Sequence, residues 1–462
     1  MSIAVFDVGK TNVKLFAATA DGALLEHVAA PNRSLDGPPY RHHDVAALED
    51  WLLDGLADLG RRHRIEAVVA TAHGSGGVLV GEDGPAMPMI DYEQEPPPAV
   101  AGEYRRIAGS WRERGSAVML GAAHIARQMF WIEAEWPDAF ARATAFLATP
   151  QYWAWRLSGV AAGEVTSLAA QSHLWAPADG KPAQLVADRR WERLLPAMRP
   201  AWEALGCLRP EIAARTGLAP ETRVLNGVHD SSANFYRYQA AGLSDLTVVS
   251  TGTWIVSLTD RSEGVDFDTE RPARSCNADV FGRPTPGMLT MGGREFSSVA
   301  GDAPRRVSRE TLARLVESGT MALPSFGPDD GLFPGTARRG FVEGPLGDDP
   351  EHRYGLAVLY AALLTAECLD DLPTAQTVAL DGGFVQEPMF GALVAALVPR
   401  SRIIVNHDPF GTATGAALLA GHTTRRGPAP LSADAPDASG LPDLTSYRAR
   451  WRESARNRSD PQ

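Results

Sequence analysis

The residues best suited to chemistry in this chain of 462 residues lie at its N-terminus. An apolar run, Ile3 to Phe6, leads into Asp7, and a short turn that begins at Gly9 follows. Gly9 would let the backbone approach an anion, and Asp7 offers the hard oxygen ligand that Mg²⁺ prefers. The side chains that could donate to phosphate oxygens are those of Lys10, Thr11, Asn12 and Lys14. This spacing predicts a turn that holds phosphates and a metal, although an ordinary tight hairpin with a charged tip would have the same pattern.

The same turn also has the last three residues of a P-loop, GxxxxGK[ST]. The first glycine of that motif would fall at Ala4, inside the run predicted as a strand. Residues 13–18 read as a second strand, whereas a P-loop is followed by a helix. We therefore exclude a Walker A motif and predict a hairpin.

Three later segments also place glycine, hydroxyl or carboxylate groups at strand ends. Asp230 follows a strand predicted at 224–227, Thr251-Gly252-Thr253 follows one at 246–250, and Asp381-Gly382-Gly383 follows one at 376–380. In open sheets, ligands bind beyond the strand ends, where side chains from several strands converge. Asp230 could instead be a helix N-cap, and Asp381-Gly382-Gly383 a plain turn.

The elements that must position these residues form two similar series. The strand, glycine turn and strand at 246–258 repeat the layout of the N-terminal hairpin, so we predict two halves built on one plan. Helical spacing is clear at 44–63, 98–113, 124–135 and 353–369, and small residues fill a helix at 411–421. We divide the chain into domains 1–240 and 241–421 and a peripheral tail, 422–462, ordered in part around Tyr447 and Trp451.

Composition limits the classes of function. The net charge of −12 argues against a general nucleic-acid binder, which would carry a basic excess. Three widely spaced cysteines form neither a disulfide framework nor a metal-binding pattern, which fits a reducing compartment. The sequence contains no secretory signal and no apolar run of membrane length. We therefore expect a cytoplasmic protein that binds neither nucleic acid nor membrane.

Together these motifs resemble the FGGY family of carbohydrate kinases, within the superfamily that includes actin and Hsp70. The resemblance runs from residue 3 to residue 421. Residues 7–14 are similar to the family's first phosphate motif, 227–230 to its catalytic-aspartate segment, 250–253 to its second phosphate motif and 381–383 to its adenosine motif. It implies an α/β protein with two ribonuclease H-like domains, a cleft between them, and ATP and Mg²⁺ as cofactors.

The resemblance also assigns roles to single residues. Asp230 is the expected catalytic base and Asp7 the expected metal ligand. The expected nucleotide-binding residues are Gly9, Lys10, Thr11, Asn12, Lys14, Thr251, Gly252, Thr253, Gly382, Gly383 and Gln386. The expected sugar-binding residues are His73, Gly74, Asp91, Tyr92, Glu93 and Asp230.

Several positions depart from the family pattern. Lys10 stands where threonine is frequent, Lys14 where arginine is, and Gln386 where an asparagine commonly follows the glycine pair. Residues 91–93 replace the tryptophan and aspartate of the sugar loop. Arg294 and Glu295 could pair with each other or face the cleft.

The resulting hypothesis is ATP-dependent phosphorylation of a small sugar, with Asp230 as general base. The resemblance favours a ketose such as L-fuculose, L-rhamnulose or xylulose, and it makes a homodimer a reasonable expectation. The alternative is an ATP-binding clamp or sensor of the same superfamily without kinase activity.

Overall fold

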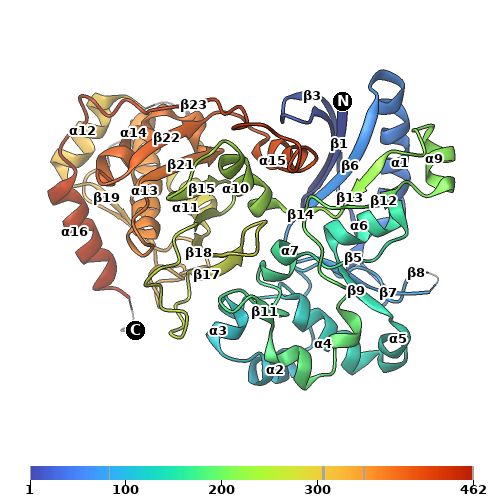
Figure 1. Cartoon of the computed structure of the whole chain (residues 1–462). Helices are drawn as coiled ribbons and strands as arrows, with labels where there is room; N and C mark the ends of the chain where they lie inside the picture. Colours follow the sequence, from blue (N-terminus) through green and yellow to red (C-terminus); the bar gives the residue numbers. More distant parts are fainter. Residues whose placement is uncertain (1, 83, 304–306, 347–348, 460–462) are drawn as a thin grey trace.

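A computed structural model describes residues 2–82, 84–303, 307–346 and 349–459 of the chain. Two α/β halves lie side by side, and helices α10 (Asp230–Ala240) and α15 (Gly411–Leu419) lie between their sheets (Figure 1). Each half is organised around a seven-stranded sheet.

The N-terminal sheet has the order β12-β13-β6-β1-β2-β3, and β14 also pairs with β6. Its strands are β1 (Ser2–Val8), β2 (Asn12–Thr19), β3 (Leu24–Pro31), β6 (Ile65–Ala72), β12 (Ala204–Cys207), β13 (Arg223–Leu225) and β14 (Val228–His229). β1 and β2 form the predicted antiparallel hairpin, while β6 lies parallel to β1.

The C-terminal sheet has the order β17-β18-β16-β15-β21-β22-β23. Its strands are β15 (Leu246–Thr251), β16 (Ile255–Thr259), β17 (Arg274–Ala278), β18 (Pro284–Thr290), β21 (Thr377–Gly382), β22 (Arg402–Asn406) and β23 (Ala433–Asp434). The series β18-β16-β15-β21-β22 has the same strand directions as β3-β2-β1-β6-β13. The predicted two-domain, ribonuclease H-like α/β fold is therefore confirmed.

Both faces of the N-terminal sheet are covered, because side chains alternate along its strands. Phe6 and Leu15 pack on one face with α1 (Val45–Arg62), α6 (Thr149–Ser158) and α9 (Pro210–Thr216). Val5 and Phe16 pack on the other face with α10 and α15. Asp44 is the predicted N-cap of α1, and its carboxylate accepts a hydrogen bond from the amide of Ala47.

α10 also packs against the second sheet. Phe235 and Tyr238 contact Leu246, Val248 and Ala379 of the C-terminal half, whereas Ala233 and Tyr236 contact the N-terminal half. One helix therefore forms a layer between the two sheets, and Asp230 is its first residue.

A smaller lobe is inserted in the N-terminal half and lies at the bottom of Figure 1. It contains β7 (Gly77–Gly81), β8 (Gly84–Pro85), β9 (Ala145–Ala148), β10 (Trp175–Ala176), β11 (Lys181–Pro182), α2 (Pro98–Ile107), α3 (Trp111–Arg114), α4 (Ile125–Glu135), α5 (Pro137–Arg142), α7 (Val165–Ala169), α8 (Gln184–Asp188) and η1 (Glu192–Leu194). The single helix predicted at 98–113 was wrong. Gly109 adopts φ 83° between α2 and α3, which interrupts the helix.

The remaining elements complete the two halves. β4 (Ser34–Leu35) pairs with β5 (His42–His43) near the start of the chain. The other C-terminal elements are α11 (Gly292–Ala300), α12 (Arg309–Ser318), β19 (Met321–Leu323), β20 (Phe341–Glu343), α13 (Pro350–Asp370), η2 (Phe384–Gln386) and α14 (Pro388–Leu397). α13 is buried from Tyr354 to Leu369 and forms the centre of this core.

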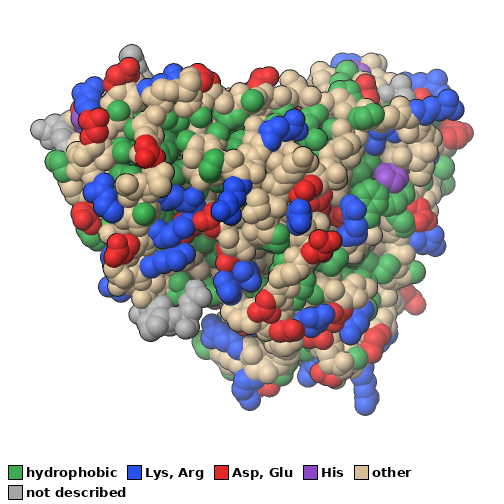
Figure 2. All heavy atoms as spheres, turned by 60° about the vertical axis from the view of Figure 1, so that its left-hand side comes forward, with side chains coloured by type: hydrophobic (Ala, Val, Ile, Leu, Met, Phe, Trp, Pro, Cys, Tyr) green, Lys and Arg blue, Asp and Glu red, His purple; other side chains and the backbone are tan. Residues whose placement is uncertain are grey.

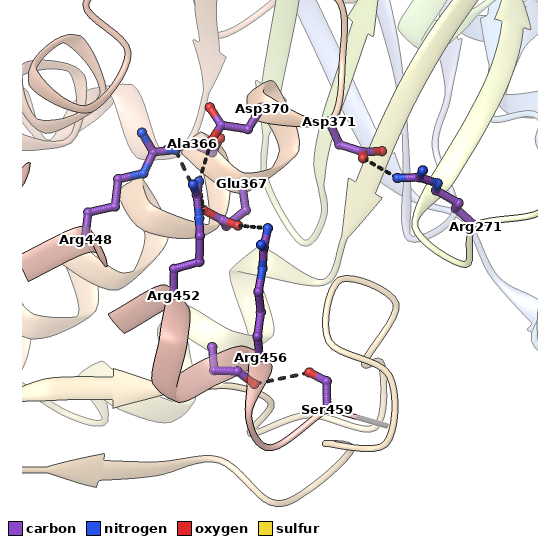
Figure 3. Close-up of polar contacts among 10 residues, drawn as sticks. Arg271, Ala366, Glu367, Asp370, Asp371, Arg448, Arg452, Arg456 and Ser459 are labelled. Atoms are coloured by element: carbon purple, nitrogen blue, oxygen red, sulfur yellow. Dashed lines mark hydrogen bonds and ion pairs between the residues drawn. The ribbon is translucent and has the colours of Figure 1, made fainter. Parts of the chain in front are cut away.

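The segment predicted as a peripheral tail contributes to the C-terminal core. β23 joins the sheet, and α16 (Thr445–Arg456) buries Tyr447 and Trp451, the residues around which order was expected. Arginines on α16 face acidic residues on α13 (Figure 3). Arg452 Nε donates to Glu367 at 2.7 Å and Arg448 Nη2 lies 2.9 Å from Asp370 Oδ2, so this helix is held by charge as well as by apolar packing.

The surface carries both signs of charge, and acidic and basic side chains are interspersed over the face drawn in Figure 2. Within the described ranges, none of the helices is long and apolar enough to cross a bilayer.

Candidate active site

One edge of the N-terminal sheet brings together three residues predicted for the site. Ala72 of β6 is paired with Val8 of β1 and with His229 of β14. Asp7, His73 and Asp230 are each the direct neighbour of one of these paired residues. The register of the strands therefore brings together, at one edge of the sheet, side chains that are far apart in the sequence.

The Asp7 carboxyl group has an unusual electrostatic environment. Burial, and then the negative charge of Asp230, raise its pKa to about 7, while Lys14 on the neighbouring strand opposes the shift. Strand register brings the two carboxyl groups near each other, because Asp7 precedes Val8, Asp230 follows His229, and Val8 and His229 both pair with Ala72. Among the described residues, the Asp7 side chain has no hydrogen-bond partner. A partly buried carboxyl group without a partner fits a place for a cation.

Asp230 is the first residue of α10, and the N-cap of that helix is His229. Its Oδ1 accepts from the Ser231 amide at 2.5 Å and lies 3.1 Å from His229 Nε2. His229 is in turn held by Ser232 and by Thr166, whose hydroxyl accepts from the His229 amide at 3.0 Å. Asp230 retains 34% exposure of its side chain, so a fixed carboxylate remains accessible to a ligand from solvent.

The first predicted phosphate turn connects β1 to β2. The Gly9 amide donates to the Asn12 carbonyl at 3.0 Å, and a Cβ at Gly9 would lie only 2.9 Å from that oxygen. Asn32 donates to the Gly9 carbonyl at 2.8 Å, which fixes the turn from the end of β3. Thr11 and Asn12 are exposed at its tip.

His73 and Gly74 follow β6 at the same edge. A Cβ at Gly74 would meet Ala170 Cβ at 2.6 Å, so this position requires glycine. The His73 ring meets the Tyr92 ring edge-on, with centroids 5.2 Å apart. Burial lowers the pKa of His73 to about 4 despite the nearby charge of Asp230. The imidazole is therefore neutral at pH 7 and can both donate and accept hydrogen bonds.

Asp91 is the centre of a buried charge network. It accepts from Lys10 Nζ at 2.9 Å and Ser34 Oγ at 2.7 Å, and Arg41 Nε lies 3.0 Å away. Burial raises the Asp91 pKa, but the hydrogen bonds from Lys10 and Ser34 outweigh it and lower the pKa to about 2. Asp91 is thus a permanent anion that ties the first phosphate turn to the loop at 91–93.

This network gives Lys10 partners other than phosphate. Its ammonium group also lies 3.7 Å from Glu93 and 5.7 Å from the centre of the Tyr92 ring. The role of Lys10 in nucleotide binding stays a prediction. The structure places Lys10 next to three residues that were predicted to bind the sugar.

The second predicted phosphate turn, 251–253, is joined to the end of β21. Thr251 is buried, and its hydroxyl donates to the Asp381 carbonyl at 2.6 Å and accepts from the Phe384 amide at 3.0 Å. Gly382 adopts φ +91°, and a Cβ there would lie 2.0 Å from the Thr251 carbonyl oxygen. Thr251 and Gly382 therefore hold the two segments together, and Gly252 and Thr253 are left to face the cavity.

A cavity of 760 Å³ opens beside this turn in the C-terminal half. Its polar end contains Gly252, Thr253 and Arg294, and Gly383 and Gln386 also line it. Its apolar wall is formed by Phe296, Tyr354, Val358, Ala361, Phe384 and Phe390. The volume and the combination of an aromatic wall with a polar mouth suit a nucleotide.

The donor set fits Mg²⁺ in one respect. The described residues contain no group of three or more histidine, cysteine or acidic side chains that could hold a metal alone. Mg²⁺ commonly takes one or two carboxylates together with phosphates and water, and Asp7 can supply such a ligand.

Sequence reasoning missed several residues of this site. The aromatic wall of the cavity comes from α11, α13, η2 and α14, and no local motif marks it. His229 was not predicted as a site residue, although its position next to a candidate base was a usable signal.

Strand order and the shared helix layer define a two-domain α/β fold with candidate site residues in each half. The N-terminal domain model of the FGGY family of carbohydrate kinases matches residues 2–235, and the FGGY C-terminal domain model matches residues 243–428. The chain therefore belongs to the FGGY family of carbohydrate kinases.

Individual relatives agree with this assignment. L-fuculokinase of Escherichia coli strain K12 is 26% identical over 307 residues, which span 62% of each chain. The crystal structure of a carbohydrate kinase from Novosphingobium aromaticivorans shares 30% identity with a TM-score of 0.88 and covers 98% of both chains. Ligand-bound xylulose kinase from Lactobacillus acidophilus shares the fold, at 14% identity and a TM-score of 0.80, over 98% of this chain and 97% of its own. The comparisons give the clamp or sensor alternative no support.

Proposed function

We propose that this protein transfers the γ-phosphoryl group of ATP to a hydroxyl of a small sugar. The observation that carries the proposal is the pair of carboxyl groups, Asp7 and Asp230, beside one sheet edge in a chain whose opposite half holds a nucleotide-sized cavity. A ketose such as L-fuculose, L-rhamnulose or xylulose is the proposed acceptor. The similarity to L-fuculokinase supports this class of sugar.

In the proposed reaction, Asp230 accepts the proton of the sugar hydroxyl as that oxygen attacks the γ-phosphorus. The hydrogen bonds from Ser231 and the contact with His229 orient its carboxylate. Orientation matters because the proton leaves late in a loose phosphoryl-transfer transition state.

The sugar is proposed to lie against His73, Gly74 and the loop at 91–93. The neutral imidazole of His73 and the charge-compensated Lys10–Asp91 pair suit hydroxyl groups. This environment favours a neutral polyhydroxy acceptor.

The nucleotide is proposed to lie with its base against Phe296 and Phe384 and its phosphates between the turns at 9–12 and 251–253, near Lys14. Gly382, Gly383 and Gln386 would complete the nucleoside end. When bound, Mg²⁺ would neutralise phosphate charge, and Asp7 is the residue that would hold it.

The domain limits 1–240 and 241–421, a cytoplasmic location and a homodimer are further proposals. Three free cysteines support a reducing compartment. The family matches end at 235 and begin at 243, which supports a boundary near 240.

The test is ADP release with a panel of ketoses, aldoses, polyols and glycerol. Sugar-stimulated release by the wild type should fall about 10²–10⁴-fold in Asp230→Asn, with ADP affinity unchanged. Asp266→Asn, an exposed site elsewhere, is the matched control. Sugar-independent ATP turnover that persists in Asp230→Asn would refute the proposed function.

A further inference from the structure

The first turn of α11 is docked directly on the second phosphate turn. The Gly293 amide donates to the Thr253 carbonyl at 3.1 Å. A Cβ at Gly293 would lie 2.2 Å from the Gly252 carbonyl oxygen, and one at Gly292 would lie 2.3 Å from Ile255. A side chain at either glycine would push the start of α11 away from the turn at 251–253, so only glycine permits this close contact. Arg294 follows this contact immediately, so its backbone position is fixed relative to Gly252 and Thr253.

The next residue, Glu295, is also fixed. Its carboxylate is buried and accepts from the amides of Phe326 and Gly327 at 2.9 and 2.6 Å and from the Tyr360 hydroxyl at 2.6 Å. These bonds direct Glu295 into the core of the C-terminal half. Of the two arrangements left open by the sequence, pairing of Arg294 with Glu295 is therefore excluded.

The Arg294 side chain is left available to a ligand. It is exposed, and among the described residues it has no hydrogen-bond or ion-pair partner. Of the described residues that line the 760 Å³ cavity, Arg294 is the only lysine or arginine. Burial raises the Tyr92 pKa to about 12, and the charge of Arg294 acts on this phenol in the opposite direction. Arg294 thus lines the cavity proposed for the nucleotide, and its charge acts on a residue of the loop proposed for the acceptor in the other half.

We propose that Arg294 binds the phosphoryl group in transit. This inference rests on the proposed function. The acceptor oxygen forms a bond to the γ-phosphorus, the bond from that phosphorus to the β–γ bridging oxygen breaks, ADP leaves with the electron pair, and the hydroxyl proton passes to Asp230. Arg294 exchanges no proton. Its planar guanidinium donates two parallel hydrogen bonds to the phosphoryl oxygens, where negative charge is spread in the transition state.

The first experiment needs no knowledge of the sugar. It compares the affinities of ADP and of a non-hydrolysable ATP analogue for the wild type, Arg294→Ala and Arg294→Lys in the presence of Mg²⁺. Because only the analogue carries a γ-phosphate, Arg294→Ala should weaken its binding about tenfold and leave ADP binding within about threefold. Arg314→Ala, an exposed arginine on α12, is the control. Equal affinities of the wild type and Arg294→Ala for the analogue would overturn the inference.

The second experiment measures turnover with the best sugar of the panel. Arg294→Ala should lower kcat about 10³-fold with an unchanged acceptor KM, and added guanidinium ion should restore part of the rate. The kcat of Arg294→Lys should lie between those of the wild type and Arg294→Ala. Lysine keeps the positive charge but lacks the planar guanidinium that donates two parallel hydrogen bonds. A change confined to the acceptor KM would overturn the inference. Absence of sugar-stimulated turnover in the wild type would instead overturn the proposed function, and the affinity comparison would still decide the contact with the γ-phosphate.

Discussion

The Asp7 carboxyl group changes its charge near neutral pH, because its pKa is strongly raised in the folded protein. Its pKa in the folded protein is raised to about 7, whereas an unfolded aspartate has a pKa of about 3.9. Between these values the folded state binds a proton that the unfolded state does not. The contribution of Asp7 to the free energy of unfolding therefore falls as pH rises through this range and levels off above about pH 7.

We predict that Asp7→Asn removes this pH dependence. Without ligands, its melting temperature should exceed that of the wild type by more at pH 8 than at pH 5, with a difference of roughly 2 °C or more. The same variant should lose Mg²⁺-dependent activity. Differential scanning fluorimetry across pH provides the measurement, with Asp50→Asn on the exposed face of α1 as control. A difference in melting temperature that is constant with pH would contradict the raised pKa.

Single site residues were predictable from the sequence where close backbone packing requires glycine. Gly9, Gly74 and Gly382 lie at contacts that a Cβ would obstruct. Gly9 and Gly382 were selected from their strand-end positions, and Gly74 from the family resemblance. The hydrogen bonds of Thr251 to β21 could not be predicted, because they depend on contacts 130 residues away in the sequence. The pairing of Lys10 with Asp91 could not be predicted for the same reason, because the two residues are 81 positions apart.

At the scale of elements, the junction of β15 and β21 depends on Gly382. Gly382→Ala should destabilise the protein by about 2 kcal/mol, because the alanine would adopt an unfavourable φ and contact the Thr251 carbonyl. Urea unfolding measures this change. Gly252→Ala is the matched control, since no described atom lies within 4 Å of the Cβ it would add. Equal stability of the two variants would show that the close contact at Gly382 does not contribute to stability.

The contact between α13 and α16 is a second element that can be tested. Glu367 is 8% exposed, and its partners include Arg452 and, at 3.8 Å, Arg456 (Figure 3). Glu367→Gln should cost roughly 1–2 kcal/mol, because it leaves partly buried guanidinium groups with less compensation. Glu453→Gln, exposed on α16, should change stability little. A loss in both variants, or in neither, would argue against a specific role for this cluster.

Both hairpins and four of the long helices were predictable from local pattern. Apolar runs and glycine turns identify the hairpins, and these are the parts that repeat between the halves. The inserted lobe and α16 carry weaker local signals. Trp451 becomes fully buried only because Phe333 and Tyr360 of other elements enclose it.

For the whole molecule, the chain order of motifs was enough to predict two like-folded halves, but not the helix layer that joins them. α10 and α15 cross where Gly415 meets Ala233, and a Cβ at Gly415 would lie 1.8 Å from the Ala233 carbonyl oxygen. This close approach depends on two small residues 182 positions apart, which no local pattern relates. Because α10 begins with Asp230, the spacing of these helices sets the position of the candidate base relative to the C-terminal cavity.

Gly415→Ala should therefore act on catalysis from a distance. The added methyl group must separate the two helices, so we expect kcat to fall about tenfold or more, since small displacements of reacting groups are costly. ADP affinity should change less than threefold, because the cavity lies within the C-terminal half. Gly102→Ala in α2 controls for the substitution itself, because the added Cβ would meet nothing within 4 Å beyond its chain neighbours and its own helix backbone. Full activity in Gly415→Ala would mean that the crossing of α10 and α15 does not position Asp230, whereas parallel losses of ADP binding and turnover would indicate damage to the whole C-terminal half.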